Sequence, residues 1–228
     1  MKSFIFELGC EEIPARFLNT ILNDMTDITQ KWASDASISL TDNAIQVYAS
    51  YRRLALIIHN LPEKQADISS IVNGPPLAVA KKDGEWQAAA LGFAKKVNMP
   101  IDEISISTDD KGREILQATQ EQKGKALPDL LSELMTSIIS SMPLPIAMRW
   151  GAEESPFIRP IHWVLALFGN DIVPVQLFNQ FSSNLSYGHR FLSDNATDAS
   201  SGKEITVQNA GTYIEDLRSV NVMVDQNE

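Results

Sequence analysis

The spacing of apolar residues at the start of the chain predicts a strand, an amphipathic helix and two more strands. Residues 3–8 alternate as in a strand, and apolar residues three and four apart extend a helix from Glu11-Glu12-Ile13-Pro14 to about Ala33. Carboxylates and proline suit a first helical turn, so that acidic segment favours a helix start. Two aliphatic strands, 45–50 and 54–58, follow.

The middle of the chain predicts a turn, two helices and a hairpin. Asn73-Gly74-Pro75-Pro76 indicates a turn that neither a helix nor an inner strand could cross. Apolar spacing predicts helices over 86–97 and 127–142. Strand-like segments at 104–106 and 114–119 predict a hairpin, because turn-forming residues lie between them.

The last third predicts a second hairpin, a linker and a short helix. Strands at 161–168 and 172–177 flank Gly169-Asn170-Asp171, which is a clear turn signal. Residues 195–202 are small, polar and aperiodic, as in a linker. A final helix is expected over about 209–218.

Together these elements predict a mixed α/β fold of the α+β class, with antiparallel-rich sheets and packed helices. Two regions are expected. The first, residues 1–145, ends at the stiff pair Pro143 and Pro145. The second, residues 146–228, could be continuous with the first and is expected to be completed by sequence downstream. An apolar run just before the last residues favours a chain that continues.

Composition narrows the class of protein. Of 228 residues, 44% are hydrophobic and 21% charged, as in soluble globular proteins. No apolar run is long enough to span a membrane, and acidic residues stand where a signal peptide would be cleaved, so a cytoplasmic protein is expected. A net charge of −10 argues against a surface that wraps nucleic acid, and any contact with RNA is expected to be local.

Familiar catalytic signatures are absent from the sequence. It contains no G-x-x-x-x-G-K-[ST] phosphate loop, no G-x-G-x-x-G, no H-E-x-x-H and no G-x-S-x-G. The single cysteine, Cys10, precedes two glutamates that would raise the pKa of its thiol, which disfavours a nucleophilic role. Three histidines are too few and too scattered to indicate a metal site. Neither a catalytic residue nor a metal ligand is expected.

Arginines, histidines and aromatic residues gather in the second half of the chain. They form the segments Met148-Arg149-Trp150-Gly151, Phe157-Ile158-Arg159-Pro160-Ile161-His162-Trp163 and Gly188-His189-Arg190-Phe191. Guanidinium groups donate hydrogen bonds in fixed pairs and rings supply rigid apolar area, so these segments predict a surface that recognises phosphates, carboxylates or bases. An interface with another protein explains them equally well.

The charged neighbours of these segments leave alternatives open. Glu11 and Glu12 could bind a cation or a basic partner, but stabilisation of a helix dipole accounts for them as well and is the favoured interpretation. Arg149 and Arg159 flank the acidic pair Glu153-Glu154, so an internal ion-pair network competes with ligand binding.

The two histidines of these segments receive different interpretations. His162 falls on an apolar strand and is interpreted as a core histidine with a satisfied hydrogen bond. His189 is the better functional candidate, because glycine and arginine frame it in a polar segment. One alternative function is therefore a stand-alone hydrolase or anionic-ligand-binding domain that uses His189 with nearby arginines.

Six segments in this order carry a resemblance to a known family. They are Glu7-Leu8-Gly9-Cys10-Glu11-Glu12-Ile13-Pro14, Tyr51-Arg52-Arg53-Leu54-Ala55-Leu56, Asn73-Gly74-Pro75-Pro76, Met148-Arg149-Trp150-Gly151, Phe157-Ile158-Arg159-Pro160-Ile161-His162 and Gly188-His189-Arg190-Phe191. Together they resemble the beta subunit of bacterial heterotetrameric glycyl-tRNA synthetase. The resemblance covers only the N-terminal part of that subunit.

The resemblance implies a division of labour. In that family the alpha subunit makes glycyl-adenylate from glycine and ATP, with Mg²⁺, and the beta subunit supports tRNA recognition and charging. An HD-like helical domain and an anticodon-binding domain would lie beyond Glu228, and no cofactor is expected in this chain. The residues expected to bind the alpha subunit, later beta domains or the acceptor end of tRNA(Gly) are Arg52, Arg53, Arg149, Trp150, Arg159, His162, His189 and Arg190.

Overall fold

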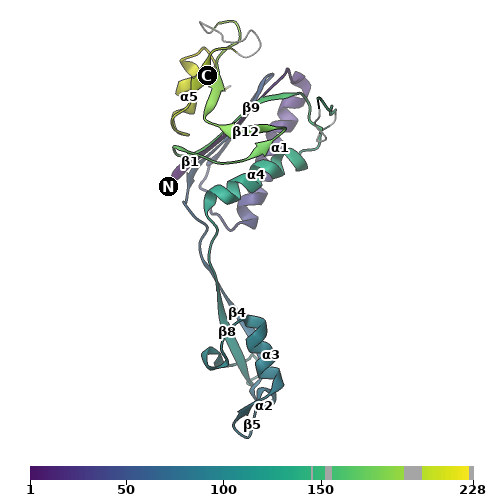
Figure 1. Ribbon diagram of the computed structural model, residues 1–228, viewed down its shortest axis with the longest axis vertical. Coiled ribbons are helices and arrows are strands. Elements are labelled where there is room, and N and C mark those ends of the chain that lie inside the picture. Colours follow the sequence, from purple (N-terminus) through teal and green to yellow (C-terminus); the bar gives the residue numbers. More distant parts are fainter. Residues whose placement is uncertain (145, 152–155, 193–201, 226–228) are drawn as a thin grey trace. The chain divides into compact units, whose positions relative to one another are not determined.

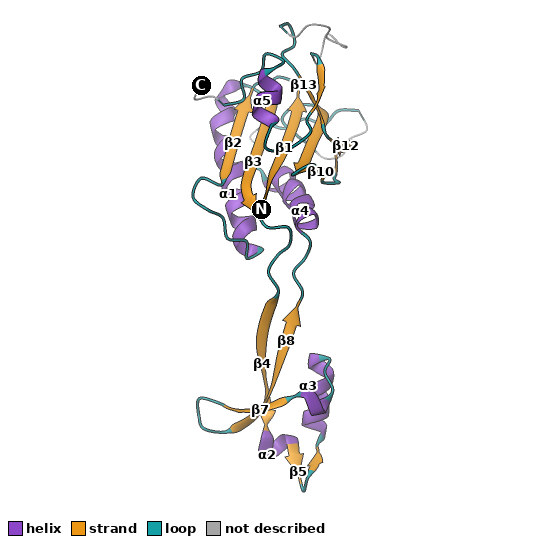
Figure 2. Cartoon of the chain, turned by 90° about the vertical axis from the view of Figure 1, so that its left-hand side faces the viewer, coloured by secondary structure: helices purple, strands orange, loops and turns teal. Residues whose placement is uncertain are grey.

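The chain folds into two compact units. The computed structural model describes residues 1–144, 146–151, 156–192 and 202–225, and Figures 1 and 2 show its elements. Residues 1–65 and 125–228 form the first unit, and residues 66–124 form the second. The expected boundary after residue 145 falls inside the first unit, so the two units do not coincide with the two expected regions.

A seven-stranded sheet is the centre of the first unit, in the order β11, β12, β9, β1, β3, β2, with β10 beside β9. The strands are β1 (Lys2–Cys10), β2 (Ile45–Ser50), β3 (Arg53–Leu61), β9 (Ile161–Phe168), β10 (Asp171–Ile172), β11 (Gln176–Leu177) and β12 (Gln180–Ser183). β12 runs parallel to β9, and the other pairs are antiparallel. The predicted strands at the positions of β1, β2, β3 and β9 are confirmed, as is the α+β class.

Two helices, α1 (Leu18–Asp35) and α4 (Leu127–Ser141), cover one face of this sheet (Figure 2). They pack on the even-numbered residues of β1, including Phe4 and Phe6, which are fully buried. The indole of Trp32 donates to the carbonyl oxygen of Leu130 at 3.0 Å and so links the two helices. Burial of this apolar area is the main term that stabilises the unit.

The opposite face is covered by β13 (Leu185–Tyr187), β14 (Glu204–Thr206) and α5 (Tyr213–Arg218). Odd-numbered residues of β1 point to this side, where Ile5 joins a second buried cluster with Tyr213. Because both faces of the sheet are covered, its central strands are nearly continuous apolar runs.

The second unit is a small α+β unit. Its three-stranded antiparallel sheet has the order β4 (Ile68–Pro76), β8 (Glu114–Gln122), β7 (Ser105–Thr108). The shorter elements are α2 (Leu77–Ala80), β5 (Lys81–Lys82), β6 (Glu85–Trp86) and a 3₁₀ turn (Ile101–Glu103). Helix α3 (Ala88–Val97) belongs to the same buried cluster as Leu116 of β8. The predicted helix and hairpin of this region are confirmed.

The prediction of a turn at residues 73–76 is wrong. These residues complete β4, and the register with β8 shifts between Asn73 and Pro76. β4 is an edge strand, so its prolines need no second strand partner. Gly74 is required by packing, because a β-carbon there would lie 2.7 Å from the ring of Phe93.

The first helix begins later than expected. The backbone N–H groups of Cys10, Glu11 and Ile13 donate to carbonyls outside this segment, which keeps it extended. Helical structure starts only with a 3₁₀ turn (Ala15–Phe17). The helix-dipole interpretation of Glu11 and Glu12 is therefore wrong, because neither residue lies in a helix.

The chain after β9 also differs from expectation. The expected strand 172–177 is divided into β10 and β11, since Pro174 lies between them and has no N–H to donate. The final helix begins at Tyr213 instead of residue 209. Most of the expected linker, residues 195–201, lies outside the described residues. Within the described part of the chain, no helix is long and apolar enough to cross a membrane.

Candidate functional site

Three segments of the first unit meet around a pocket of about 200 Å³. They are the turn between β2 and β3, the loop after β13, and the chain after α5. The pocket is lined by Ser50, Tyr51, Arg52, Arg53, Trp163, Gly188, His189, Arg190, Asn221, Val222 and Met223. We call it the arginine pocket. It brings together four of the eight residues predicted to bind a partner: Arg52, Arg53, His189 and Arg190.

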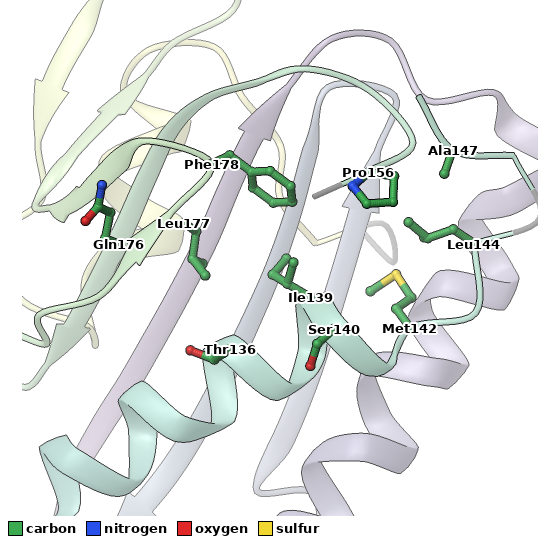
Figure 3. A pocket seen from close by; sticks show the side chains of 10 residues that line it. All are labelled: Thr136, Ile139, Ser140, Met142, Leu144, Ala147, Pro156, Gln176, Leu177 and Phe178. Carbon is green, nitrogen blue, oxygen red and sulfur yellow. The ribbon is translucent and has the colours of Figure 1, made fainter. Parts of the chain in front are cut away.

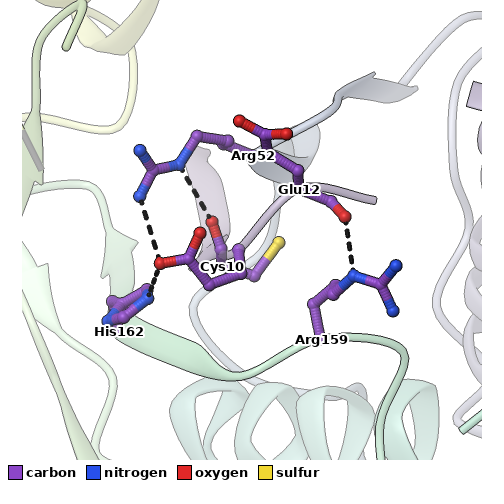
Figure 4. A network of polar contacts seen from close by, with 6 residues as sticks. Cys10, Glu12, Arg52, Arg159 and His162 are labelled. Carbon is purple, nitrogen blue, oxygen red and sulfur yellow. Dashed lines mark hydrogen bonds and ion pairs between the residues drawn. The ribbon is translucent and has the colours of Figure 1, made fainter. Parts of the chain in front are cut away.

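Arg52 occupies the two-residue turn between β2 and β3. Its backbone carbonyl accepts from Cys10 N at 3.0 Å, and its Nε donates to the carbonyl of Cys10 at 3.4 Å (Figure 4). One terminal nitrogen, Nη2, lies 3.8 Å from Oε1 of Glu11. That nitrogen is buried and has no hydrogen-bond acceptor among the described residues. The side chain is therefore fixed beside the pocket with donor capacity left over.

Arg53 begins β3 and is only 8% exposed. Its Nη2 donates to the carbonyl of Tyr187 at 2.5 Å, and its guanidinium lies 5.7 Å from the ring centre of Trp163. Its Nε lies 3.3 Å from Oε2 of Glu7 but is not aligned for a hydrogen bond. A buried guanidinium requires a counter-charge, and Glu7 supplies it.

Glu7 is a fully buried carboxylate that the sequence did not single out. Its Oε1 accepts from Nε1 of Trp163 at 2.5 Å and from Oγ of Ser186 at 2.7 Å, and its Oε2 accepts from the hydroxyl of Tyr213. Burial and this carboxylate raise the pKa of Tyr213 well above its usual value. The only sequence signal was one acid within an apolar strand, and such an acid needs partners.

Gly9 makes this arrangement possible. In the sheet it lies between Arg53 of β3 and Trp163 of β9. A β-carbon at Gly9 would be 1.9 Å from Cε2 of Trp163. Without a side chain at this position, the indole crosses over β1 to reach Glu7, and it also forms part of the pocket wall.

His189 shapes the other side of the pocket. Its Nδ1 accepts from the backbone N–H groups of Phe191 and Leu192, each at 3.2 Å. The backbone N–H of His189 donates to the carbonyl of Val220 at 2.9 Å, which joins this loop to the chain after α5. A ring whose Nδ1 accepts hydrogen bonds carries its proton on Nε2 when it is neutral.

His162 is exposed, so its interpretation as a core histidine is wrong, although its hydrogen bond is satisfied. It is the second residue of β9, close to the point where the register between β9 and β1 shifts. Its Nε2 lies 2.9 Å from Oε1 of Glu11, the same oxygen that faces Arg52. Glu11 thus ties β9 to the arginine pocket (Figure 4).

The remaining predicted residues lie elsewhere in the first unit. Nε of Arg159 donates to the carbonyl of Glu12 at 2.8 Å (Figure 4), and Arg149 is exposed. The acidic pair predicted to bridge these arginines, 153–154, lies outside the described residues. Trp150 packs against Phe178, with ring centres 5.2 Å apart.

Phe178 also lines a larger pocket of about 490 Å³ (Figure 3). Residues of α4 form one side, with Thr136, Ile139 and Ser140, and Leu177 lies across from them. The lining is apolar apart from hydroxyl groups and the amide of Gln176, so this pocket suits apolar side chains instead of an anion.

Cys10 is buried between β1 and the helices. Burial raises the pKa of its thiol to about 12, with Glu11 contributing and Arg52 opposing. Such a thiol is protonated at neutral pH and unreactive, as the glutamates beside it indicated.

Comparison with known proteins links the sequence of this chain to a family. The family model of the glycyl-tRNA synthetase beta subunit matches residues 4–228. The glycine–tRNA ligase beta subunit of Lactobacillus gasseri is 36% identical over 228 residues, which are 100% of this chain and 31% of that protein. The Bacillus subtilis counterpart is 34% identical over 225 residues, 98% of this chain and 31% of that protein. The Pseudomonas putida counterpart is 35% identical over 224 residues, with the same two shares. The chain therefore spans about 31% of the length of these curated relatives.

Proposed function

The chain belongs to the glycyl-tRNA synthetase beta subunit family, and from this premise we propose that it acts as the N-terminal assembly and tRNA-recognition part of such a subunit. It would support ATP-dependent attachment of glycine to its tRNA. The observation that carries the proposal is the family match over residues 4–228. The relatives are named glycine–tRNA ligase beta subunits, which supports the same assignment.

The partners follow from the name of the family. A beta subunit implies an alpha subunit, and a tRNA ligase implies tRNA(Gly). We assign the adenylation site, with ATP and Mg²⁺, to the alpha subunit, and we assign the complex to the cytoplasm. Two observations count against a catalytic role for these side chains: Nδ1 of His189 is occupied by backbone donors, and the thiol of Cys10 is protonated.

The two pockets suggest two different contacts. The arginine pocket offers cationic donors and suits an anion such as a tRNA phosphate. Trp150 lies beside the apolar pocket of Figure 3 through its contact with Phe178, and Arg149 is next to it in the chain. Tryptophan and arginine are enriched in the parts of interfaces that contribute most to binding. We therefore assign this second region to contact with the alpha subunit or later beta domains.

The alternative function, an anionic-ligand-binding domain, shares one observation with the proposal. His189 does lie with arginines around one pocket, but these are Arg52, Arg53 and Arg190. Arg149 and Arg159 are not among its lining residues. A hydrolase using His189 as a base is disfavoured, because Nδ1 accepts two backbone hydrogen bonds and the remaining ring nitrogen carries the proton.

The experiment that tests the proposal is size-exclusion chromatography with light scattering. The chain is run alone and mixed with the alpha subunit of the same organism. A stable complex is the expected result, and it would place an assembly surface within residues 1–228. A folded chain that forms no complex would overturn the assembly role, while circular dichroism distinguishes this outcome from misfolding.

A further inference from the structure

We propose that the outer edge of β2 binds an extended segment of the alpha subunit, which adds one more strand to the sheet of the first unit. When a peptide strand adds to a sheet edge, main-chain hydrogen bonds give affinity and alternate side chains give specificity. The identity of the partner rests on the proposed function. The pairing chemistry rests on β2, which is the last strand in the order of the sheet (Figure 2).

Every second residue of β2 turns its backbone groups away from the sheet. The backbone N–H of His59 donates to the carbonyl of Ala44 at 2.9 Å, which sets the alternation of hydrogen-bonded pairs between β3 and β2. Even-numbered residues of β2 therefore direct their N–H and C=O groups toward β3, and Ile45, Val47 and Ala49 direct theirs outward. In the part of the chain that the structure describes, these outward groups form no hydrogen bond. A partner strand could pair with all of them.

β2 lacks the features that protect an edge strand from pairing. Its six residues include no charged side chain and no proline, and its register with β3 has no shift. At the other edge of the same sheet, β10 and β11 are only two residues long, and Pro174 separates them. β4, an edge strand of the second unit, ends in two prolines after a register shift. Natural sheets use short strands, prolines and bulges to prevent pairing, so an edge without them indicates a pairing site.

The apolar side chains of β2 are incompletely covered. Ile45, Val47 and Ala49 lie on the side of the sheet that the helices cover, because they pair with even-numbered residues of β3 that belong to that core. These β3 partners are at most 1% exposed, whereas the three β2 residues are only half-buried. A strand added beside β2 would remove more of this apolar area from water, which favours pairing.

A polypeptide is the occupant that matches this edge. A nucleic acid has no repeating row of backbone N–H and C=O groups with which the outward groups could pair, so tRNA is not the partner here. A second copy of the chain is disfavoured, because each copy carries a net charge of −10 and like charges repel. The relatives are named beta subunits, and a beta subunit implies an alpha subunit, so we assign the edge to that polypeptide.

Residue-resolved hydrogen–deuterium exchange tests this assignment on the 228-residue chain, with and without the alpha subunit of the same organism. In the free chain the amides of Ile45, Val47 and Ala49 should exchange fast, whereas those of Gln46 and Tyr48, which face β3, should exchange slowly. The alpha subunit should slow the three outward amides by at least about tenfold and leave the other two nearly unchanged. This alternation distinguishes strand pairing from a general stabilisation, which would slow all of these amides.

Val47→Pro removes one outward donor. The N–H of Val47 does not face β3, so proline at this edge position breaks no hydrogen bond within the sheet. Val47→Ala is the matched control, because it shortens the same side chain and keeps the N–H. Titration calorimetry should show about tenfold weaker binding of the alpha subunit by Val47→Pro than by Val47→Ala. Circular dichroism verifies that both variants are folded.

A complex that leaves the three outward amides unprotected, or that binds both Val47 variants equally, would overturn this inference and leave the assembly role intact. Absence of any complex would overturn both proposals. Protection that appears in the chain alone and grows with its concentration would assign the edge to a second copy and overturn the assignment to the alpha subunit. If Val47→Pro does not fold, exchange in the unmodified chain still decides between these outcomes.

Discussion

The indole of Trp163 lies directly over Gly9, so closely that a β-carbon at position 9 would be 1.9 Å from its Cε2. Gly9 pairs with Trp163 on one side and with Arg53 on the other. The absence of one side chain therefore lets two large ones meet above the central strand, where both reach Glu7. The arginine pocket is built on this contact.

Gly9→Ala should destabilise the protein by about 1–3 kcal/mol, because overpacking forces the indole or the strand to shift. Urea unfolding followed by tryptophan fluorescence measures the change. Gly92→Ala is the control, since a β-carbon there meets nothing and Gly92 lies in helix α3, where alanine is favoured. Equal stability of Gly9→Ala and the wild type would contradict the packing argument.

Glu7→Gln should lower the free energy of unfolding by about 3–5 kcal/mol, because it leaves the buried guanidinium of Arg53 without a counter-charge. Adding Arg53→Met to Glu7→Gln should recover part of this loss, since both charges are then removed. A double-mutant cycle in urea measures the coupling. Additive losses would show that the two side chains do not interact. Glu133→Gln, at an exposed ion pair with Lys125, should change stability little.

The thiol of Cys10 should make stability fall at alkaline pH. Its pKa is raised from 9.0 to about 12 by burial, so between these values the unfolded chain has lost a proton that the folded chain retains. Stability then decreases by about 1.4 kcal/mol per pH unit from this group, and its contribution is intact below pH 9.

Cys10→Ala removes the Cys10 contribution, so the difference in unfolding free energy between wild type and variant should slope downward above pH 9. Parallel curves would contradict the shifted pKa. Native protein at neutral pH should also resist a thiol-specific reagent until denaturant is added.

Trp150→Ala should weaken the complex with the alpha subunit while the chain stays folded. Trp150 is partly buried against Phe178 beside the apolar pocket, a position typical of an interface anchor. Light scattering of the mixed subunits measures the complex. Trp86→Ala is a useful control because Trp86 lies in the second unit. Unchanged assembly would move the contact away from Trp150.

Arg149→Ala combined with Arg190→Ala should lower tRNA charging by the full complex and leave adenylate formation unchanged. The reason is that both arginines are proposed to bind partners and neither is assigned to the chemistry. Aminoacylation and pyrophosphate exchange measure the two steps. If both activities fall equally, a general structural defect explains the variant better than lost tRNA contact.

The sequence predicted only part of the candidate site. The Arg52-Arg53 turn and the His189-Arg190 segment were recognised because clustered cationic and aromatic residues stand out in a sequence of low basic content. Glu7 was missed, since its partners come from β3, β9, β13 and α5, up to 206 positions away. His162 was misread because strand periodicity does not reveal where the cover over a sheet face ends.

Local patterns in the sequence determined the strands β1, β2, β3 and β9, the helices α1, α3 and α4, and the family, because periodicity and short motifs depend on neighbouring residues. Only the tertiary structure decided which segments meet. Arg53 lies 134 positions from Tyr187, whose carbonyl it contacts, and the pairing depends on β1, β3 and β9 being adjacent and on Gly9 leaving space. Strand order and close packing are properties of the whole fold, so no local pattern could report them.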